Sequence, residues 1–327
     1  MNTNLADIFP TTYRDRFRTA AGRGEQVSEI RLRISRPAIL MEGDREYFLR
    51  DDGAYTKHME QAWHPDRQAL EEILSHLCQY SLYAYEDELR QGYITIEGGH
   101  RVGVVGQAVQ ESVGAIRTIK HISALNIRIA HQVLGAADPV LPYIYKGGSL
   151  YNTLIVSPPG CGKTTLLRDM VRQISGGNAY GPARTVGVVD ERSEIAGCYM
   201  GQPQNDLGPR SDVLDACPKA LGMMMLLRSM SPAVLAVDEL GSGEEVRAVR
   251  MAASCGVSLM ATVHGMDMQD AQAKPGMGEL LAEGIFTCML VLKRDRQGRC
   301  RVRQIFHRRR MDGIWEEVAR DDAAGWL

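Results

Sequence analysis

A glycine-rich stretch in the middle of the chain carries the residue types that bind phosphate groups. Residues 157–165 read Ser-Pro-Pro-Gly-Cys-Gly-Lys-Thr-Thr, close to the phosphate-loop pattern Gly-x4-Gly-Lys-Ser/Thr, with a serine where the first glycine would stand. Its two glycines allow successive backbone N–H groups to turn toward an anion. The lysine would then contact the β- and γ-phosphates of a nucleotide, and the hydroxyl of the next threonine would ligate Mg²⁺. The predicted nucleotide-binding residues are Ser157, Pro158, Pro159, Gly160, Cys161, Gly162, Lys163, Thr164 and Thr165.

Two adjacent acids, Asp238 and Glu239, supply the groups that hydrolysis of a bound nucleotide needs. They follow the apolar run Ala-Val-Leu-Ala-Val at 233–237, so they would lie at the carboxyl edge of a parallel sheet, where such folds bind ligands. We expect Asp238 to hold Mg²⁺ and Glu239 to orient or deprotonate the attacking water. Taken alone, the pair is explained as well by two solvated acids, but the phosphate loop upstream favours catalysis.

A second acidic cluster, Asp-Glu-Arg-Ser-Glu at 190–194, also follows an apolar run. Its position at a strand end makes Asp190 a candidate Mg²⁺ ligand and makes Glu191 and Glu194 candidate catalytic residues that position water. A loop held by an ion pair between Arg192 and Glu194 is nearly as good an explanation. The residues alone leave both open.

A histidine ends a further strand-like run. His264 follows the apolar residues 258–263 and precedes a glycine. A lone histidine usually has a structural role, but one at the tip of an adjacent strand of this sheet would instead sense the γ-phosphate. We therefore include it among the candidate catalytic residues.

Arginines that would stabilise charge in the transition state are harder to identify. A surface or structural role explains each arginine when it is taken singly. Any one of them could instead be an arginine finger, which contacts the phosphates of its own or a neighbouring subunit's site. Arg210 and Arg228 lie between the two nucleotide motifs and are the candidates we retain. The first part of the chain offers Arg117 and Arg128.

The overall charge gives no reason to expect nucleic acid as the main partner, because the formal net charge is −2. One segment, 293–310, is locally basic, and a solvated hairpin face explains it best; anionic lipid or nucleic acid are weaker explanations. The seven cysteines are widely spaced without a Cys-x-x-Cys pair, which favours a reducing compartment over disulfides or zinc. With no leader-like or membrane-spanning run, we expect a cytoplasmic protein.

The pattern of apolar runs predicts an α/β fold around these motifs. Continuous apolar strands separated by helix-like segments imply a mainly parallel sheet covered on both faces. A turn at 294–298 and the alternating residues 299–306 predict an antiparallel return beside the last of these strands, and Met223, Met224 and Met225 fit a buried helix. The five strand-like runs are 154–156, 186–189, 234–237, 259–263 and 289–292.

The first part of the chain has a different hydrophobic pattern and contains no recognisable set of catalytic residues. Alternation at 29–35 predicts a half-buried strand, an apolar stripe at 70–78 predicts an amphipathic helix, and 93–109 predicts a hairpin with a glycine-bearing turn. We therefore predict a smaller α+β N-terminal domain before a RecA-like P-loop NTPase domain. The predicted boundaries are 1–134 for the first domain, 135–149 for a linker rich in glycine and proline, and 150–327 for the second.

Ordered blocks along most of the chain resemble the stage III sporulation protein AA family, a relative of the type II and type IV secretion ATPases. The blocks include Glu-Ile-Arg-Leu-Arg from 29, Gly-Gly-His-Arg-Val-Gly from 98, the phosphate loop, Val-Asp-Glu-Arg-Ser-Glu-Ile from 189, and Ala-Thr-Val-His-Gly from 261. A generic ATPase would match only the nucleotide motifs.

The resemblance implies roles for several residues. Asp190, Glu191 and Glu194 match the acidic box of secretion ATPases, His264 matches their histidine box, and Arg228 matches the arginine of a Leu-Arg-x-x-Pro stretch. It further implies ATP and Mg²⁺ as cofactors, a ring-shaped homo-hexamer, and ATP-driven rotation of one domain against the other. Membrane-embedded channel or secretion proteins would be its partners, on the cytosolic face of the mother-cell membrane of an endospore former.

Three functions remain distinguishable at this point. We expect an ATP-hydrolysing motor that energises a sporulation channel between mother cell and forespore. A RecA-like motor on nucleic acid would use the basic segment 293–310, and a nucleotide-dependent scaffold would bind ATP with little hydrolysis. The balanced net charge disfavours the nucleic-acid motor, and the intact phosphate loop and acidic pair disfavour the scaffold.

Overall fold

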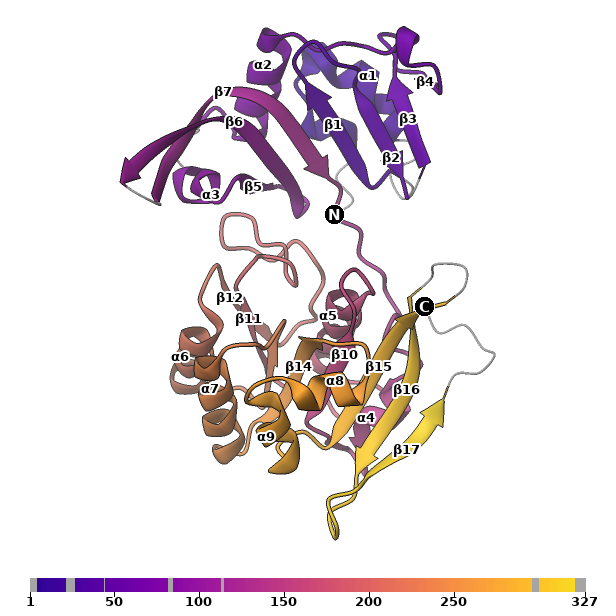
Figure 1. The fold of residues 1–327 in the computed structure, drawn as a ribbon, viewed down its shortest axis with the longest axis vertical. Helices are drawn as coiled ribbons and strands as arrows, with labels where there is room; N and C mark the ends of the chain where they lie inside the picture. The colour runs from indigo at the N-terminus through magenta and orange to yellow at the C-terminus, as the bar shows by residue number, and fades with distance from the viewer. Residues whose placement is uncertain are drawn as a thin grey trace. The chain divides into compact units, whose positions relative to one another are not determined.

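The computed structural model of the chain describes residues 5–21, 27–43, 45–81, 85–112, 115–295 and 300–320. Its contacts separate two compact units (Figure 1). Unit 1 consists of Met1–His131 together with Gly197–Gln204, and unit 2 consists of Gln132–Ala196 and Asn205–Leu327. The predicted domain boundary and linker remain predictions. Within 135–149 the structure has a short helix and a two-stranded hairpin.

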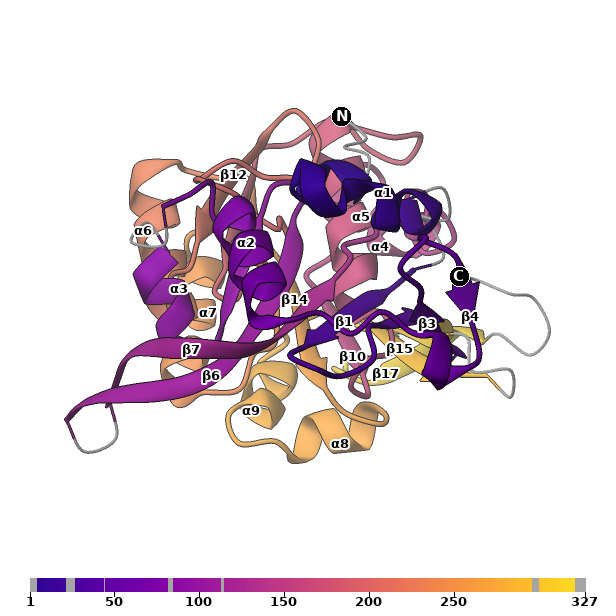
Figure 2. The same ribbon diagram turned by 90° about the horizontal axis from the view of Figure 1, so that it is seen from above.

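Unit 1 is built on an antiparallel sheet with the strand order β4-β3-β2-β1-β7-β6-β5. Its strands are β1 (Glu29–Arg33), β2 (Ile39–Glu42), β3 (Arg45–Leu49), β4 (Tyr55–Thr56), β5 (Tyr93–Ile96), β6 (His100–Ser112) and β7 (Ala115–Arg128). Its helices are η1 (Leu5–Ile8), α1 (Thr11–Ala21), η2 (Met59–Gln61), α2 (Arg67–Leu77) and α3 (Glu86–Arg90). The long hairpin β6–β7 extends past the other strands of this unit (Figure 2).

The periodicities of the first part of the chain give the elements that they predict. β1 alternates between buried and half-buried residues, and α2 buries Leu70, Ile73, Leu74 and Leu77 along one stripe. Asp66 caps α2 by accepting a hydrogen bond from the Ala69 amide over 2.8 Å. The stripe packs with strands β1, β5, β6 and β7 in one hydrophobic core. The core of unit 1 therefore lies between its sheet and its helices.

Unit 2 is an α/β unit with a large mixed sheet of strand order β12-β11-β13-β14-β10-β15-β16-β17. The pairs from β12 to β15 are parallel, and β15, β16 and β17 pair antiparallel. The strands are β10 (Thr153–Ser157), β11 (Val186–Asp190), β12 (Ser211–Asp215), β13 (Val234–Val237), β14 (Ser258–His264), β15 (Cys288–Arg294), β16 (Cys300–Arg308) and β17 (Trp315–Arg320), with the separate hairpin β8 (Tyr145–Lys146) and β9 (Ser149–Leu150). The helices are α4 (Leu141–Ile144), α5 (Lys163–Gly176), α6 (Lys219–Ser229), α7 (Gly243–Ser254), α8 (Met268–Ala273) and α9 (Met277–Ala282).

Helices cover both faces of this sheet. The connection β10–α5–β11 crosses the sheet in one direction, whereas β12–α6–β13 and β13–α7–β14 cross it in the other (Figure 1). Because such crossovers are right-handed, α5 lies on one face and α6 and α7 lie together on the opposite face. Covered on both sides, β10, β11 and β13 are buried throughout, which is why their sequences are continuously apolar.

Two expectations at the edges of this unit had different outcomes. The antiparallel return of β16 beside β15 is confirmed, although the predicted turn at 294–298 falls partly on 296–299, outside the described residues. The prediction of a buried methionine helix is wrong for Met225. Met223 is fully buried, but 46% of Met225 is exposed, because α6 packs through one stripe only.

Parallel pairing brings the carboxyl ends of β10, β11, β13 and β14 to one edge of the sheet. Ser157 is in register with His264, and Val189 with Val237. The residues after each strand therefore meet at that edge, which is the site described next. None of the helices in the described part of the chain is both long and apolar enough to cross a membrane.

Candidate functional site

The phosphate loop joins β10 to α5, as its sequence predicts. Ser157 ends β10 fully buried, and its hydroxyl donates to the carbonyl of Pro158 over 2.8 Å. Gly160 and Gly162 have φ values of +64° and +79°, which glycine adopts without strain. Gly162 is the N-cap of α5, so the free N–H groups of the first helical turn open into the loop. The serine in place of the first glycine leaves this arrangement intact.

The lysine and threonine of the loop lie against the acidic pair that follows β13. The Lys163 ammonium is 2.6 Å from a carboxylate oxygen of Glu239, and the Thr164 hydroxyl donates to Asp238 over 2.6 Å. These partners are separated by more than seventy positions in the sequence, and the register of β13, β14 and β10 brings them together. Sequence reasoning named all four residues but could not give their pairing.

Thr262 on β14 completes the environment of Asp238 and was not foreseen. It is fully buried, its hydroxyl donates to the second carboxylate oxygen of Asp238, and the same hydroxyl accepts from the Glu239 amide over 2.9 Å. Its position two residues before His264 offers the only sequence signal, and threonine in an apolar strand is common. Thr262 fixes both acids relative to β14.

Glu239 is held in an unusual conformation by several partners. Its φ is +54°, a left-handed value that costs a residue with a side chain roughly 1–3 kcal/mol. The His264 Nε2 atom lies 2.9 Å from its carboxylate, and Arg192 lies 3.5 Å from it. Burial alone would raise the pKa of Glu239. The hydrogen bond and charge of Lys163, with His264 and Arg192, outweigh burial and hold the pKa below its usual value.

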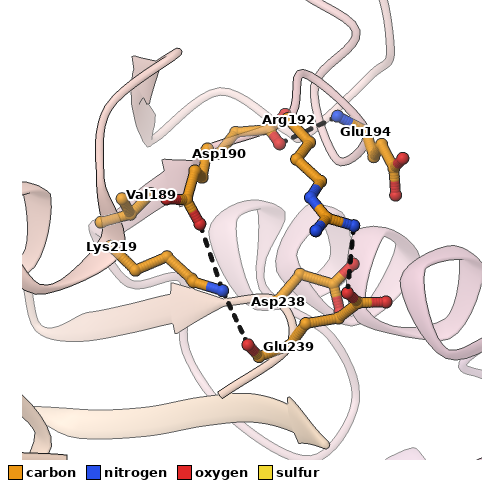
Figure 3. Close-up of a pocket in the computed structure, with 8 residues that line it drawn as sticks. Val189, Asp190, Arg192, Glu194, Lys219, Asp238 and Glu239 are labelled. Atoms are coloured by element: carbon orange, nitrogen blue, oxygen red, sulfur yellow. Dashed lines mark hydrogen bonds and ion pairs between the residues drawn. The ribbon is translucent and has the colours of Figure 1, made fainter. Parts of the chain in front are cut away.

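The Asp190 carboxylate has a structural role that the sequence did not predict: it binds backbone amides of the residues that follow it. Its carboxylate accepts hydrogen bonds from the amides of Glu194, Ile195 and Ala196, all within 2.9 Å. These three bonds stabilise the turn formed by residues 190–196, which we call the acidic loop. Figure 3 shows one of them as the dashed line from Asp190 to Glu194. Burial is the main cause that raises the pKa of Asp190 to about 6, despite these donors. The geometry gives its predicted Mg²⁺ role no support.

The raised pKa of Asp190 predicts a pH-dependent contribution to stability. Because the folded-state pKa of about 6 lies above the unfolded value of 3.8, this contribution is present below about pH 4 and lost as pH rises through 6. The free energy of unfolding of the wild type, measured relative to Asp190→Asn, should therefore fall by about 2 kcal/mol between pH 4 and 7. Urea unfolding at a series of pH values measures it. Glu244→Gln on the exposed face of α7 is the control, and a pH-independent difference would contradict the prediction.

Arg168 is a second residue that sequence reasoning missed. It points from α5 to the acidic loop, where its Nε and Nη2 atoms donate to the carbonyls of Ile195 and Glu194 over 2.7 and 2.6 Å. Only 9% of Arg168 is exposed, and burial lowers its pKa from the usual value. An arginine in an otherwise apolar helical stripe was the available signal. It ties the acidic loop to the helix that begins at the phosphate loop.

Lys219, the first residue of α6, reaches the same edge. Its ammonium donates to the Glu239 carbonyl over 2.7 Å and lies 3.2 Å from Glu191 and 3.3 Å from Glu245. In Figure 3 the side chains of Lys219 and Arg192 both approach Glu239. Glu191 and Glu194 line this small cleft with Asp238 and Glu239, so the structure places the acidic box beside the acidic pair.

The two retained arginines lie away from the loop in the same chain. The guanidinium of Arg210 donates to the carbonyl of Ser175, near the end of α5, so about 18 Å of helix separates that point from Lys163. Arg228 is exposed in the last turn of α6, about 14 Å of helix from Lys219. Neither reaches the phosphate loop of its own chain, and a role at a neighbouring subunit's site remains a prediction.

A different arginine, from the basic segment, does contact the phosphate loop. Arg294 at the end of β15 donates to the carbonyl of Gly160, and the thiol of Cys300 on β16 donates to the same oxygen over 3.6 Å. Burial, reinforced by a hydrogen bond with Cys300, raises the pKa of the Cys161 thiol to about 11. Part of the basic segment therefore packs on the loop. Its Arg296 and Arg299 lie outside the described residues.

Comparisons with known proteins agree with the motifs. The model of the family described as "Sporulation stage III, protein AA" matches residues 3–312. The chain is 45% identical over 270 residues to "Stage III sporulation protein AA" of Bacillus subtilis (strain 168), covering 82% of this chain and 83% of that protein. These matches confirm the resemblance found in the sequence blocks.

Solved structures show similarity of fold. The ATPase DotB of Yersinia pseudotuberculosis matches with a TM-score of 0.60 at 14% identity, over 89% of this chain and 78% of that one. The pilus retraction motor PilT, solved with bound ADP, matches with a TM-score of 0.53 at 15% identity, over 94% and 83%. At such identities the likeness extends to the α/β fold alone.

Proposed function

Because the chain belongs to the stage III sporulation protein AA family, we propose that it is an ATP-hydrolysing motor of the secretion-ATPase type. Its fold resembles those of the ATPase DotB and the pilus retraction motor PilT. In this proposal unit 2 is the RecA-like P-loop domain and unit 1 the smaller α+β domain before it. One observation carries the proposal: Lys163 and Thr164 of the phosphate loop meet the Glu239 and Asp238 carboxylates.

The donor set at this edge fits the magnesium ion that accompanies ATP. Thr164 and Asp238 present a hydroxyl and a carboxylate oxygen 2.6 Å apart, and hard oxygen donors of this kind are what Mg²⁺ prefers. Asp190 fits poorly, since both of its oxygens already accept backbone hydrogen bonds. When bound, the ion would neutralise phosphate charge. Thr164 and Asp238 would hold it, and the loop amides with Lys163 would bind the phosphates.

Glu239 is the group that would activate the attacking water. Its carboxylate pairs with Lys163, which is also the cation that a phosphate loop offers to phosphates. Phosphate oxygens would compete for that lysine, and the carboxylate it leaves would be free to accept a proton. His264, which also contacts the carboxylate, would orient it. Binding and activation would thus be linked through one lysine.

The remaining assignments concern assembly and place in the cell. We propose a ring-shaped homo-hexamer in which Arg210 or Arg228 serves the site of a neighbouring subunit, because neither reaches its own. Membrane-embedded channel or secretion proteins would be its partners. The motor would work on the cytosolic face of the mother-cell membrane during sporulation, and family membership is what supports this location.

Phosphate release from MgATP by the full chain tests the proposal. We expect turnover that needs Mg²⁺, that Thr164→Val reduces at least tenfold, and that DNA or RNA leaves unchanged. The chemistry of the pair Thr164 and Asp238 predicts this loss. Salt-sensitive stimulation by nucleic acid would instead indicate a nucleic-acid motor, since phosphate contacts weaken as salt rises. ATP binding by the assembled oligomer without phosphate release would indicate a scaffold.

A further inference from the structure

Lys219 stands where helix electrostatics disfavours a cation. It is the first residue of α6, an eleven-residue helix with no acid in its first turn. The amino end of a helix carries partial positive charge, so a lysine there is repelled rather than attracted. Only 13% of the side chain is exposed, which leaves little water to solvate the ammonium. Contacts outside the helix must therefore compensate for this placement.

Three oxygen acceptors surround the ammonium. It donates to the backbone carbonyl of Glu239 and forms ion pairs with the carboxylates of Glu191 and Glu245. The three acceptors belong to the acidic loop after β11, the turn after β13 and the first turn of α7. Lys219 is thus the point at which these three segments are joined.

The turn after β13 is held at both of its ends by this arrangement. Glu245 accepts from the amides of Gly241 and Ser242 with one oxygen and faces Lys219 with the other, while Lys219 itself binds the Glu239 carbonyl. On the opposite side, Thr262 accepts from the Glu239 amide. The peptide groups on both sides of Glu239 are therefore fixed.

A fixed backbone matters here because Glu239 is in the left-handed region, with φ of +54°. Relaxation of that φ toward ordinary values would swing the side chain away from Lys163 and His264, which its carboxylate contacts at 2.6 and 2.9 Å. Lys163 holds the carboxylate, and Lys219 holds the carbonyl of the same residue. The two lysines act on different ends of Glu239.

We propose that Lys219 is a positioning residue that holds Glu239 in its left-handed, water-activating conformation and couples that conformation to Glu191 of the acidic loop. The inference rests on the proposed ATPase function. It assigns Lys219 no contact with the phosphates. Loss of the ammonium should consequently reduce turnover without weakening nucleotide binding, and its effect should depend on whether Glu191 is present.

The test compares Lys219→Met with Lys146→Met, which removes an exposed lysine of β8, in the whole 327-residue chain. For Lys219→Met we expect kcat to fall about tenfold or more and the dissociation constant of a fluorescent ATP analogue to stay within about twofold, because positioning without binding alters the transition state alone. Glu191→Gln and the double variant complete a cycle. If Lys219 and Glu191 are coupled, the fold-decrease in kcat of the double variant should be smaller than the product of the fold-decreases of the two single variants.

Hydrogen exchange of the Glu239 and Leu240 amides gives a readout that needs no turnover. Both amides donate to Thr262, and Lys219→Met should accelerate their exchange while Lys146→Met leaves it unchanged. Unchanged exchange, or a kcat within twofold of the wild type in an active enzyme, would overturn the inference. An inactive wild type with accelerated exchange in Lys219→Met would remove the proposed function and leave the holding role standing.

Discussion

Replacing Glu239 with glutamine should lower kcat for ATP hydrolysis by roughly 10²–10⁴-fold, the usual contribution of a positioned general base. Glutamine has nearly the same shape, so the turn with φ of +54° is retained. Its amide, however, cannot take a proton from water. ATP binding should persist or strengthen, because the neutral side chain no longer competes through its charge for Lys163. Phosphate release and titration with a fluorescent ATP analogue measure the two quantities.

Glu244→Gln is the matched control for this experiment. Glu244 is on α7, its side chain is 78% exposed, and it pairs only loosely with Arg247 at 3.9 Å. The control should behave as the wild type in both assays. Wild-type turnover by Glu239→Gln would reject Glu239 as the base and would direct attention to Glu191 or Glu194 at the same cleft.

Replacing Lys163 with methionine should abolish nucleotide binding at working concentrations. The methionine retains the apolar stem of a side chain that is only 7% exposed, so packing changes little. In the proposed site the lost ammonium would make charge-assisted hydrogen bonds to phosphate, each worth roughly 1.5–3 kcal/mol. Two such bonds correspond to a dissociation constant raised by about 10²-fold or more. Equilibrium titration with a fluorescent ATP analogue measures this change.

The same substitution leaves Glu239 without its strongest partner. The hydrogen bond and charge of Lys163 both lower the pKa of the Glu239 carboxyl, so that pKa should be higher in the variant than in the wild type. Thermal unfolding shows whether the variant is folded, and Lys146→Met is the control for loss of a lysine that is not at the site. A folded Lys163→Met protein with wild-type affinity would mean that residues 157–165 do not bind the phosphates.

Much of the fold could be predicted because local periodicity reports burial. The continuous apolar runs of β10, β11 and β13 indicate strands covered on both faces, and the structure buries them in full. Periodicity reports less about how much of a helix is covered. For α6 it did not show that Met225 lies outside the packed stripe, since that depends on which neighbours the tertiary fold supplies.

For the candidate site too, some features are contained in the local sequence and others depend on the tertiary fold. Local sequence is sufficient to show which residue types lie at the end of each strand: the phosphate loop after β10, Asp190 at the end of β11, the acidic pair after β13 and His264 at the end of β14. The order of motifs also determined the family. These features are local, because a glycine turn, a strand end and a motif are each contained within a few consecutive residues.

Which of these groups are in contact depends on the folded arrangement of the chain. It paired Lys163 with Glu239, assigned the Asp190 carboxylate to backbone amides, and brought Lys219 to the Glu239 carbonyl. It also separated Arg210 from the phosphate loop by the length of α5. Most of these relations join residues far apart in the sequence, and strand order and register set their distances. A one-dimensional pattern contains neither.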